Sequence, residues 1–290
     1  MADASLLADR PAAATAAEPA LQPLAPAGGG WHCSHLYYSF DRLALKQLTD
    51  AERIAGGEQM MIELDPDIGD APMRLQTSIV SGHKADFGIM MLDPDPLKID
   101  RVHQRLLSTP LGPAIRATYS FVSMTEISEY VQSVEQFGQR LADEGLDPAS
   151  PEYAARVKAY GDRLTDMNRQ RLTPDLPPYP SMCFYPMNKK RTPGENWFML
   201  TKEERGRLMI DHAKSGMAFA GKVSQLITVG VGLENWEWGV TLWAANPEYL
   251  KDIVYRMRFD EASARYAEFG PFITSYVATA GEIIEHCQVG

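Results

Sequence analysis

Two segments of the chain combine residue types that support metal and redox chemistry. His212 lies in the helix-like run Leu208–Gly216, 27 positions after Tyr185. A single neutral imidazole is the ordinary fifth ligand of a haem iron, and a phenol can release an electron together with a proton. This pair therefore indicates an iron ligand facing a redox-active tyrosine.

The surroundings of His212 allow two interpretations. Spacings of three and four residues place Leu208, Gly216 and Phe219 on the same helical face as His212, and that face is apolar. A lone histidine on an apolar face is more often a core residue that bonds a carbonyl group. Gly216, however, would let a flat macrocycle approach the backbone one turn further on. Both interpretations stay open on these residues alone.

Tyr185 lies on an expected strand, and Met187 and Lys189 follow it at spacings of two. Residues separated by two on a strand point to the same face, so the three side chains should line one wall. A lysine beside the phenol can hold a substrate carboxylate or supply protons. The alternative is a half-buried aromatic residue beside a solvated lysine, and spacing alone favours it.

Further polar residues are weaker signals when taken one at a time. Gln225 on an expected strand and Arg171 before a proline-rich run have many structural explanations. The run Arg258–Tyr266 mixes both charge signs and is typical of an exposed helix end with ion pairs. A cationic, hydroxyl-bearing edge that binds carboxylates is the sharper alternative for this run.

Composition restricts the possible partners and the compartment. The chain has 38 acidic and 28 basic residues, a net charge of -10 and a pI near 5.1, so its surface should repel nucleic acid. No apolar run approaches the roughly 20 residues that span a bilayer, and no secretory signal is evident. Three widely spaced cysteines and six scattered histidines form neither a disulfide framework nor a zinc motif. We expect a cytoplasmic protein that binds no membrane.

The alternation of apolar and polar residues predicts two copies of one element order. In the first half, strands are expected at 32–40, 73–81, 87–92 and 117–124, with helices after the first strand and at 96–108. In the second half, strands are expected at 182–187, 222–231, 236–244 and 272–280. Helices there should begin at Thr201, in a capping box with Glu204, and at Asn246-Pro247. Each half has the split-βαβ order of a ferredoxin-like unit.

These expectations divide the chain into four parts. Residues 1–30 are an Ala/Pro/Gly-rich tail, 31–125 the N-terminal repeat, 126–180 a helical and proline-rich connection, and 181–290 the C-terminal repeat. The proline-dense arm at 173–180 cannot be helical. It either packs over the entrance of the second half or is a plain surface linker.

Five segments together carry a family resemblance. They are Cys183–Met187, Lys189–Arg191, Asn196–Leu200, Glu237–Leu242 and Arg256–Tyr266. From about Trp31 onward the chain resembles the chlorite dismutase-like superfamily and, within it, the coproheme decarboxylase branch. The resemblance implies an α+β fold, a dimeric α+β barrel built from two tandem ferredoxin-like repeats, which assembles as a homopentamer and binds porphyrin in the C-terminal repeat.

The resemblance also implies roles for individual residues. His212 would be the proximal iron ligand, Tyr185 the radical-forming tyrosine, and Lys189 the lysine needed for the second decarboxylation. The residues expected to contact the porphyrin or its carboxylates are Arg171, Met187, Gln225, Arg258 and Ser263. True chlorite dismutases have an arginine where this chain has Gln225, so chlorite turnover is disfavoured.

The implied activity is peroxide-dependent decarboxylation of two propionates of iron coproporphyrin III (coproheme), which is both substrate and cofactor, to give haem b. A ferrochelatase is the implied supplier of the substrate. Three rivals stay open: a haem-dependent chlorite dismutase or peroxidase, a non-catalytic haem carrier, and a haem-free barrel that binds another small molecule.

Overall fold

The computed structural model describes residues 24–289, so most of the predicted tail, at 1–23, lies outside the described residues. Within the described part, Leu24 is bonded through its carbonyl oxygen to His32 Nε2 at 2.8 Å, and Gly30 is buried. No helix between residues 24 and 289 is both long and apolar enough to cross a membrane. The same residues contain no cluster of three or more His, Cys, Asp or Glu side chains arranged to hold a metal ion.

The first repeat has the predicted order of elements. Its strands are β1 (His32–Phe40), β2 (Arg74–Val80), β3 (Phe87–Asp93) and β4 (Ile115–Met124). Its helices are α1 (Arg42–Gln47), α2 (Asp50–Glu63) and α3 (Pro96–Ser108), with a short 3-10 turn at Gly112–Ala114. The helical stretch expected after β1 is split in two because Thr49 starts a new helix, in a capping box with Glu52.

The second repeat repeats that order. Its strands are β5 (Ser181–Lys189), β8 (Val223–Val229), β9 (Trp238–Ala244) and β11 (Ile273–Val277), and its helices are α6 (Lys202–Met217) and α7 (Pro247–Met257). The capping box of Thr201 with Glu204 and the cap at Asn246 are both present. Small elements that we did not predict are β6 (Arg191–Thr192), β7 (Glu195–Asn196), a 3-10 turn (Trp197–Met199), α8 (Glu261–Ala264), β10 (Ala267–Phe269) and α9 (Ala280–His286).

The pairing of the strands confirms the two tandem ferredoxin-like repeats. Within each repeat the fourth strand lies beside the first, then the third and the second, which gives the orders β4-β1-β3-β2 and β11-β5-β9-β8. The repeats join where the fourth strand of each pairs with the second strand of the other, at β4–β8 and β11–β2. The pairings thus form a ring of eight antiparallel strands whose thinnest seam, β4–β8, is the single pair Met124 and Val229.

The interior of this ring is filled by side chains. His35, Phe121 and Phe184 are almost fully buried there, and the His35 ring stacks on Phe184 with a centroid distance of 4.1 Å. His35 Nε2 lies 2.8 Å from Thr241 Oγ1, and burial lowers the pKa of His35 to about 3. His35 is therefore a neutral core residue at physiological pH.

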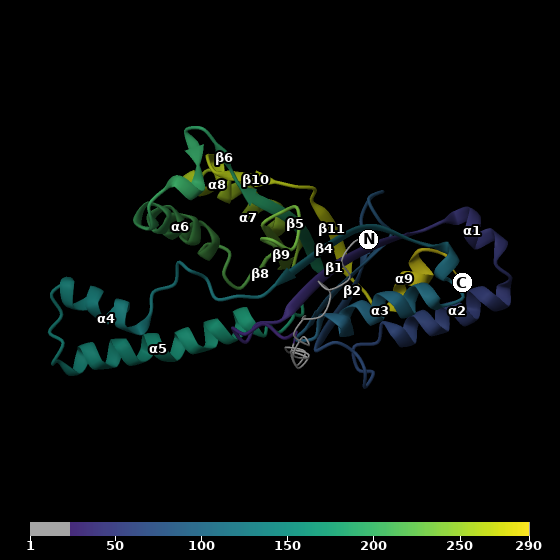
Figure 1. Cartoon of the computed structure of the whole chain (residues 1–290), viewed down its shortest axis with the longest axis horizontal. Coiled ribbons are helices and arrows are strands. Elements are labelled where there is room, and N and C mark those ends of the chain that lie inside the picture. The colour runs from purple at the N-terminus through teal and green to yellow at the C-terminus, as the bar shows by residue number, and fades with distance from the viewer. Residues whose placement is uncertain (1–23, 290) are drawn as a thin grey trace, which may run out of the picture.

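The connection between the repeats projects from the barrel as a helical hairpin (Figure 1). It consists of α4 (Val134–Asp143) and α5 (Pro151–Leu172), whose aromatic rings Phe137 and Tyr160 stack at 4.0 Å. The proline-dense arm then returns to the barrel, because Arg74 Nε donates to the Pro174 carbonyl at 3.0 Å and Tyr179 OH donates to the Gly221 carbonyl at 3.0 Å. These contacts favour a packed arm over a free linker.

Two glycines provide a test of this packing. A Cβ on Gly239, which faces the interior, would lie 2.6 Å from Phe121 Cε1 and 3.1 Å from Phe184 Cε2, whereas a Cβ on Gly206 of α6 would meet nothing within 4 Å. We predict that Gly239→Ala lowers the free energy of unfolding by about 1–3 kcal/mol through overpacking. Gly206→Ala should raise it by roughly 0.5–1 kcal/mol through helix propensity. Urea unfolding of both variants measures this, and equal effects would contradict the packing described.

Candidate active site

The strand register brings several of the predicted site residues to one face of the second repeat. Tyr185 lies opposite Val240, which in turn lies opposite Ile227, and Gln225 occupies the adjacent row. Residues directly opposite each other in antiparallel strands point to the same side. Tyr185, Met187 and Gln225 therefore share the outer face of the sheet β5-β9-β8, as the alternation in the sequence predicted for the first two.

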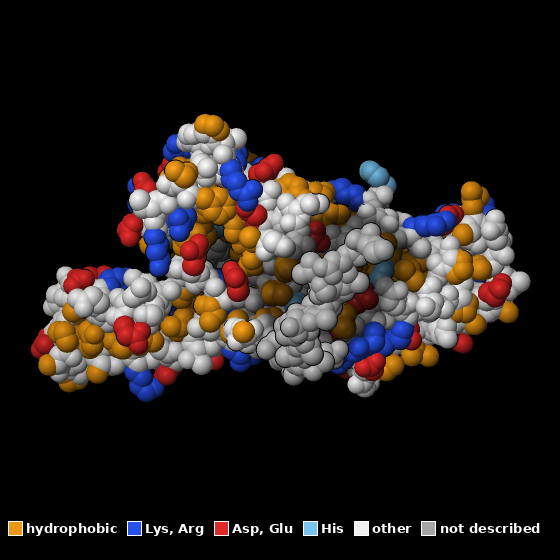
Figure 2. Space-filling view, viewed as in Figure 1, with side chains coloured by type: hydrophobic (Ala, Val, Ile, Leu, Met, Phe, Trp, Pro, Cys, Tyr) orange, Lys and Arg blue, Asp and Glu red, His pale blue; other side chains and the backbone are white. Residues whose placement is uncertain are grey.

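Helices cover the outer face of this sheet more fully over β5 and β9 than over β8. Helix α7 packs on β5, β9 and β8, whereas α6 packs against α7 and α8. On β8 the outward residues Val223, Gln225, Ile227 and Val229 are all at least partly exposed, although Leu226 and Thr228, which point inward, are buried. Figure 2 shows hydrophobic side chains around a hollow between α6 and these strands.

The two repeats differ in how the helix after the first strand packs on the sheet. In the first repeat the equivalent helix α2 places Met60, and Leu64 at its end, in the same core cluster as Phe87 of the sheet. In the second repeat Leu208 is the one buried residue of α6, and it belongs to a separate cluster with Trp197, next to α8. Helix α6 therefore contributes no buried side chain to the core beneath it on the outer face of β8.

His212 lies on α6 with a defined ring orientation. Its Nδ1 lies 3.0 Å from Asp260 Oδ2 and 3.3 Å from Ser263 Oγ, and the side chain is 23% exposed. A carboxylate only accepts, so Nδ1–H donates to Asp260 and the lone pair is on Nε2. Residues 24–289 provide no hydrogen-bond partner for Nε2. A histidine held in this way through its other nitrogen has the usual arrangement of a metal ligand.

Asp260 is fixed in turn by the start of α8. Its Oδ1 accepts the Ser263 backbone N–H at 2.9 Å, so the carboxylate both caps α8 and bonds His212. Burial opposes ionisation of Asp260, but the hydrogen bonds from His212 and Ser263 outweigh it and hold the pKa of this carboxyl below its usual value. An ionised Asp260 favours the tautomer of a neutral His212 that carries its proton on Nδ1.

Tyr185 is enclosed by aromatic side chains. It is 5% exposed, its ring stacks on Phe272 at a centroid distance of 4.4 Å, and Phe269 meets it edge-on at 5.8 Å. Burial, together with Cys183, raises the pKa of Tyr185 well above its ordinary value, against the opposing charge of Arg258. Tyr185 is therefore a neutral phenol at physiological pH, so its oxidation must release a proton as well as an electron.

Lys189 ends the same strand in a partly buried position, not as a solvated lysine. Its Nζ donates to the Ala262 carbonyl at 2.8 Å and lies 4.2 Å from the centre of the Trp197 ring. Burial lowers the pKa of Lys189 to about 8, although Asp260 acts in the opposite direction. The ammonium can thus exchange a proton close to neutral pH.

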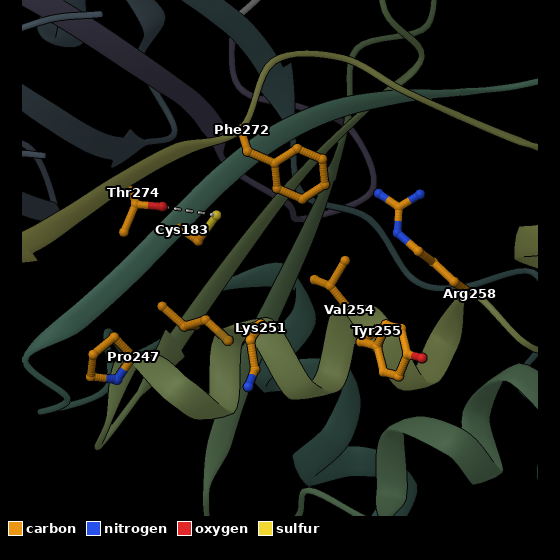
Figure 3. Close-up of a pocket in the computed structure, with 9 residues that line it drawn as sticks. Cys183, Pro247, Lys251, Val254, Tyr255, Arg258, Phe272 and Thr274 are labelled. Atoms are coloured by element: carbon orange, nitrogen blue, oxygen red, sulfur yellow. Dashed lines mark hydrogen bonds between the residues drawn. The ribbon is translucent and has the colours of Figure 1, made fainter. Parts of the chain in front are cut away.

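Arg258 lies at the end of α7, beside the aromatic residues that enclose Tyr185. Its guanidinium carbon is 4.9 Å from the centre of the Phe269 ring, and within the described chain it has no ion-pair partner. It lines a cavity of about 340 Å³ between α7 and the strands β5 and β11, together with Phe272 and Cys183. Figure 3 shows Arg258 at one end of these residues, where α7 ends. An unpaired cation at the edge of an apolar pocket is suited to a carboxylate.

The remaining predicted contacts are more dispersed. Arg171 lies in the last turn of α5, where burial lowers its pKa despite the nearby Glu126, and no hydrogen bond or ion pair joins it to the other site residues. Ser263 is 6% exposed and engaged by His212, on the side of the imidazole away from Nε2. Met187 is partly buried at the edge of the cluster around Tyr185. Their roles as porphyrin contacts stay predictions.

Three structural neighbours of these residues were not identified from sequence. Asp260, Trp197 and Phe272 contact His212, Lys189 and Tyr185 respectively. None of these contacts follows from the period of a single helix or strand, because each joins residues of different elements.

Comparison with known proteins places the chain in a family. Residues 53–278 match the family model described as chlorite dismutase. The chain belongs to the chlorite dismutase family. It is also 36% identical over 253 residues to a protein of Staphylococcus carnosus (strain TM300) named coproheme decarboxylase, a match that covers 86% of this chain and 92% of that one.

Solved structures agree with this assignment. A protein of Thermus thermophilus, described as a novel heme-binding protein, is 31% identical with a TM-score of 0.72, over 89% of this chain and 95% of the other. A mutant chlorite dismutase from Candidatus Nitrospira defluvii has a TM-score of 0.67 over 90% and 97% of the two chains, at 13% identity. At that identity the likeness concerns the fold, which is thereby confirmed as the chlorite dismutase-like α+β arrangement.

The contact between Asp260 and His212 generates a prediction. Asp260→Asn keeps an oxygen for the α8 cap but removes the charge beside Nδ1, so we expect affinity for ferric coproporphyrin to fall roughly 10- to 100-fold. Absorbance titration of the Soret band measures the dissociation constant. Asp211→Asn is the matched control, because Asp211 is exposed and pairs with Lys214 at 2.9 Å. Equal affinities for the two variants would show that Asp260 does not support His212.

Proposed function

We propose that this chain is a coproheme decarboxylase. It binds iron coproporphyrin III and, with hydrogen peroxide, converts two of the four propionates to vinyl groups, which gives haem b. The observation that carries the proposal is the match over most of the chain to the Staphylococcus carnosus coproheme decarboxylase, in a chain that has His212, Tyr185 and Lys189 around the second repeat.

The site suits a flat, acidic, largely apolar substrate. The hollow between α6 and β8 offers apolar walls for a macrocycle, and His212 Nε2 offers a free ligand for its iron. Lys189, Arg258 and Arg171 supply positive charge for the carboxylates on a protein whose net charge is -10. We assign the proximal ligand to His212, and the contacts with ring and propionates to Arg171, Met187, Gln225, Arg258 and Ser263.

Each propionate undergoes a two-electron oxidation. The balance for one side chain is –CH2–CH2–COO⁻ + H2O2 + H⁺ → –CH=CH2 + CO2 + 2 H2O. The bound iron porphyrin supplies the chemistry that passes the oxidising power of peroxide to the protein. The protein holds that substrate and provides the residue that removes hydrogen from the propionate.

Tyr185 is the residue that we assign to this oxidation. As a neutral phenol it gives up an electron and a proton, and the resulting radical takes a hydrogen atom from the nearer propionate, which restores the phenol and removes one of the two electrons. The oxidised porphyrin would take up the second electron as the bond to the carboxylate breaks, which releases CO2 and leaves the vinyl group. Phe269 and Phe272 exclude water from around the ring, which limits side reactions. Lys189, with a pKa of about 8, binds a carboxylate and exchanges a proton during the second decarboxylation.

The neutral Gln225 distinguishes this proposal from chlorite dismutation. Gln225 is exposed on the outer face of β8 and brings no positive charge to that face. A haem carrier would require His212 but neither Tyr185 nor Lys189, so turnover separates the two functions. We further propose a homopentamer in the cytoplasm that receives coproheme from a ferrochelatase.

The tyrosine assignment predicts the behaviour of one variant. Tyr185→Phe should bind coproheme with an unchanged Soret band, because the ring is retained, yet form little haem b during titration with peroxide. Mass spectrometry of the extracted porphyrin reports each step as the loss of carbon dioxide and two hydrogens. Tyr276→Phe is the matched control, because Tyr276 lies on β11 and its side chain is 41% exposed. This variant should behave as wild type.

The same titration can contradict the proposal in two distinguishable ways. Wild-type turnover by Tyr185→Phe would exclude the radical assignment. A wild-type protein that binds coproheme but leaves all four propionates intact would instead indicate a carrier, and oxygen release from chlorite would indicate a dismutase.

A further inference from the structure

A buried carboxylate lies where the main-chain ladder between β5 and β9 ends. The last pair of that ladder is Met187 with Trp238, so the next outward residue of β5, Lys189, has no backbone partner on β9. Glu237, which immediately precedes β9, fills the gap with its side chain: Oε2 accepts the Lys189 backbone N–H at 2.9 Å. The carboxylate thus continues the strand pairing by one residue.

The position of Glu237 is fixed by burial and by hydrogen bonds to its side chain and backbone. It is 5% exposed, and its Oε1 accepts from the guanidinium of Arg191, two residues beyond Lys189. Its own backbone N–H donates to Asn188 Oδ1 at 2.8 Å, and its carbonyl accepts from Gly230 N–H at 2.8 Å. The carboxylate therefore binds the chain on both sides of the Lys189–Arg191 segment and is itself held at both backbone groups.

The side chain of Lys189 is held at its other end by α8 and by Trp197. The ammonium donates to the Ala262 carbonyl at 2.8 Å and lies 4.2 Å from the centre of the Trp197 ring. The charged group that acts on this ammonium is Asp260, itself bonded to His212, whereas the Glu237 carboxylate bonds the backbone N–H of Lys189. Lys189 is thus confined between two fixed points, and Glu237 is one of them.

We propose that Glu237 is a positioning residue for Lys189: it fixes the backbone from which the ammonium reaches the second propionate. The inference rests on the proposed function, because it concerns the step that we assign to Lys189. Glu237 is not a catalytic residue in this scheme, since both of its carboxylate oxygens are occupied by the chain itself.

Glutamine at position 237 should disturb this arrangement without changing side-chain size. Lys189 and Arg191 donate to different oxygens of the carboxylate, and in an amide one of these two positions is an NH2 group, which cannot accept. The unmatched donor then faces another donor, and the Lys189–Arg191 segment shifts to relieve the contact. Displacement by about 1 Å can slow a step roughly 100-fold.

The test compares Glu237→Gln with wild type in two measurements. In the coproheme and peroxide titration, the variant should bind substrate and complete the first decarboxylation as wild type does. Its second decarboxylation should slow roughly 100-fold, so that the porphyrin with three propionates and one vinyl group accumulates. Glu195→Gln is the matched control: it makes the same charge change near the neighbouring Lys190, its partner at 3.2 Å, and should give no accumulation.

The second measurement needs no porphyrin. The rate of amine labelling at Lys189, followed by peptide mass spectrometry as a function of pH, should have its midpoint near the pKa of about 8 in wild type. Release of the ammonium from its buried position in Glu237→Gln should move this midpoint upward, towards the ordinary lysine value of 10.5. The unfolding transition shows whether Glu237→Gln has lost its structure. If it has, the test is repeated with Glu237→Asp, which keeps the charge on a shorter side chain.

The outcomes separate the two hypotheses. A folded variant at position 237 with the wild-type ratio of products and the wild-type labelling midpoint overturns the positioning role while the decarboxylase proposal stands. Equal slowing of both decarboxylations also overturns it, since that result indicates a general structural role. Wild-type protein that forms no haem b overturns the proposed function, and the positioning role in that reaction with it.

Discussion

The site depends on a difference in how the two repeats cover the outer face of their sheet. In a ferredoxin-like unit two helices must bury the apolar side of four strands. In the first repeat α2 contributes Met60 and Leu64 to the core cluster of the sheet, to which α9 from the far end of the chain adds Ile283. In the second repeat α6 packs on its neighbouring helices, and the outward residues of β8 stay partly exposed. Apolar surface left open in this way is typical of a ligand-binding groove or an interaction site.

Charge is arranged around this opening in a consistent way. Behind the imidazole, Asp260 is kept ionised by His212 and Ser263, which directs the free lone pair of His212 to Nε2. Burial lowers the pKa of Lys189, whereas burial raises the pKa of Tyr185. Two titratable groups on one strand thus have pKa values shifted from their ordinary values in opposite directions, which is typical of sites that transfer protons.

Sequence predicted the local features of this site and not the long-range ones. The strand carrying Tyr185, which runs two residues further than expected and ends at Lys189, and the start of α6 at Thr201 follow from alternation and capping, which depend on residues a few positions apart. The partner of His212 is 48 positions away and that of Lys189 Nζ is 73, so both arise only when the repeat closes. The incomplete cover over β8 likewise depends on how α6 packs, which its own sequence pattern does not reveal. The family resemblance identified His212, Tyr185 and Lys189 as site residues, but it did not identify the residues that they contact.

The most direct test is a crystal structure of the protein with ferric coproporphyrin III. We predict that iron is bonded to His212 Nε2, with Nδ1 still bonded to Asp260, and that the macrocycle lies between α6 and the outer face of β8. Gln225 and Tyr185 should then face the ring from the sheet. A porphyrin bound elsewhere, or an iron ligated by another residue while Nε2 stays free, would contradict this assignment of the site.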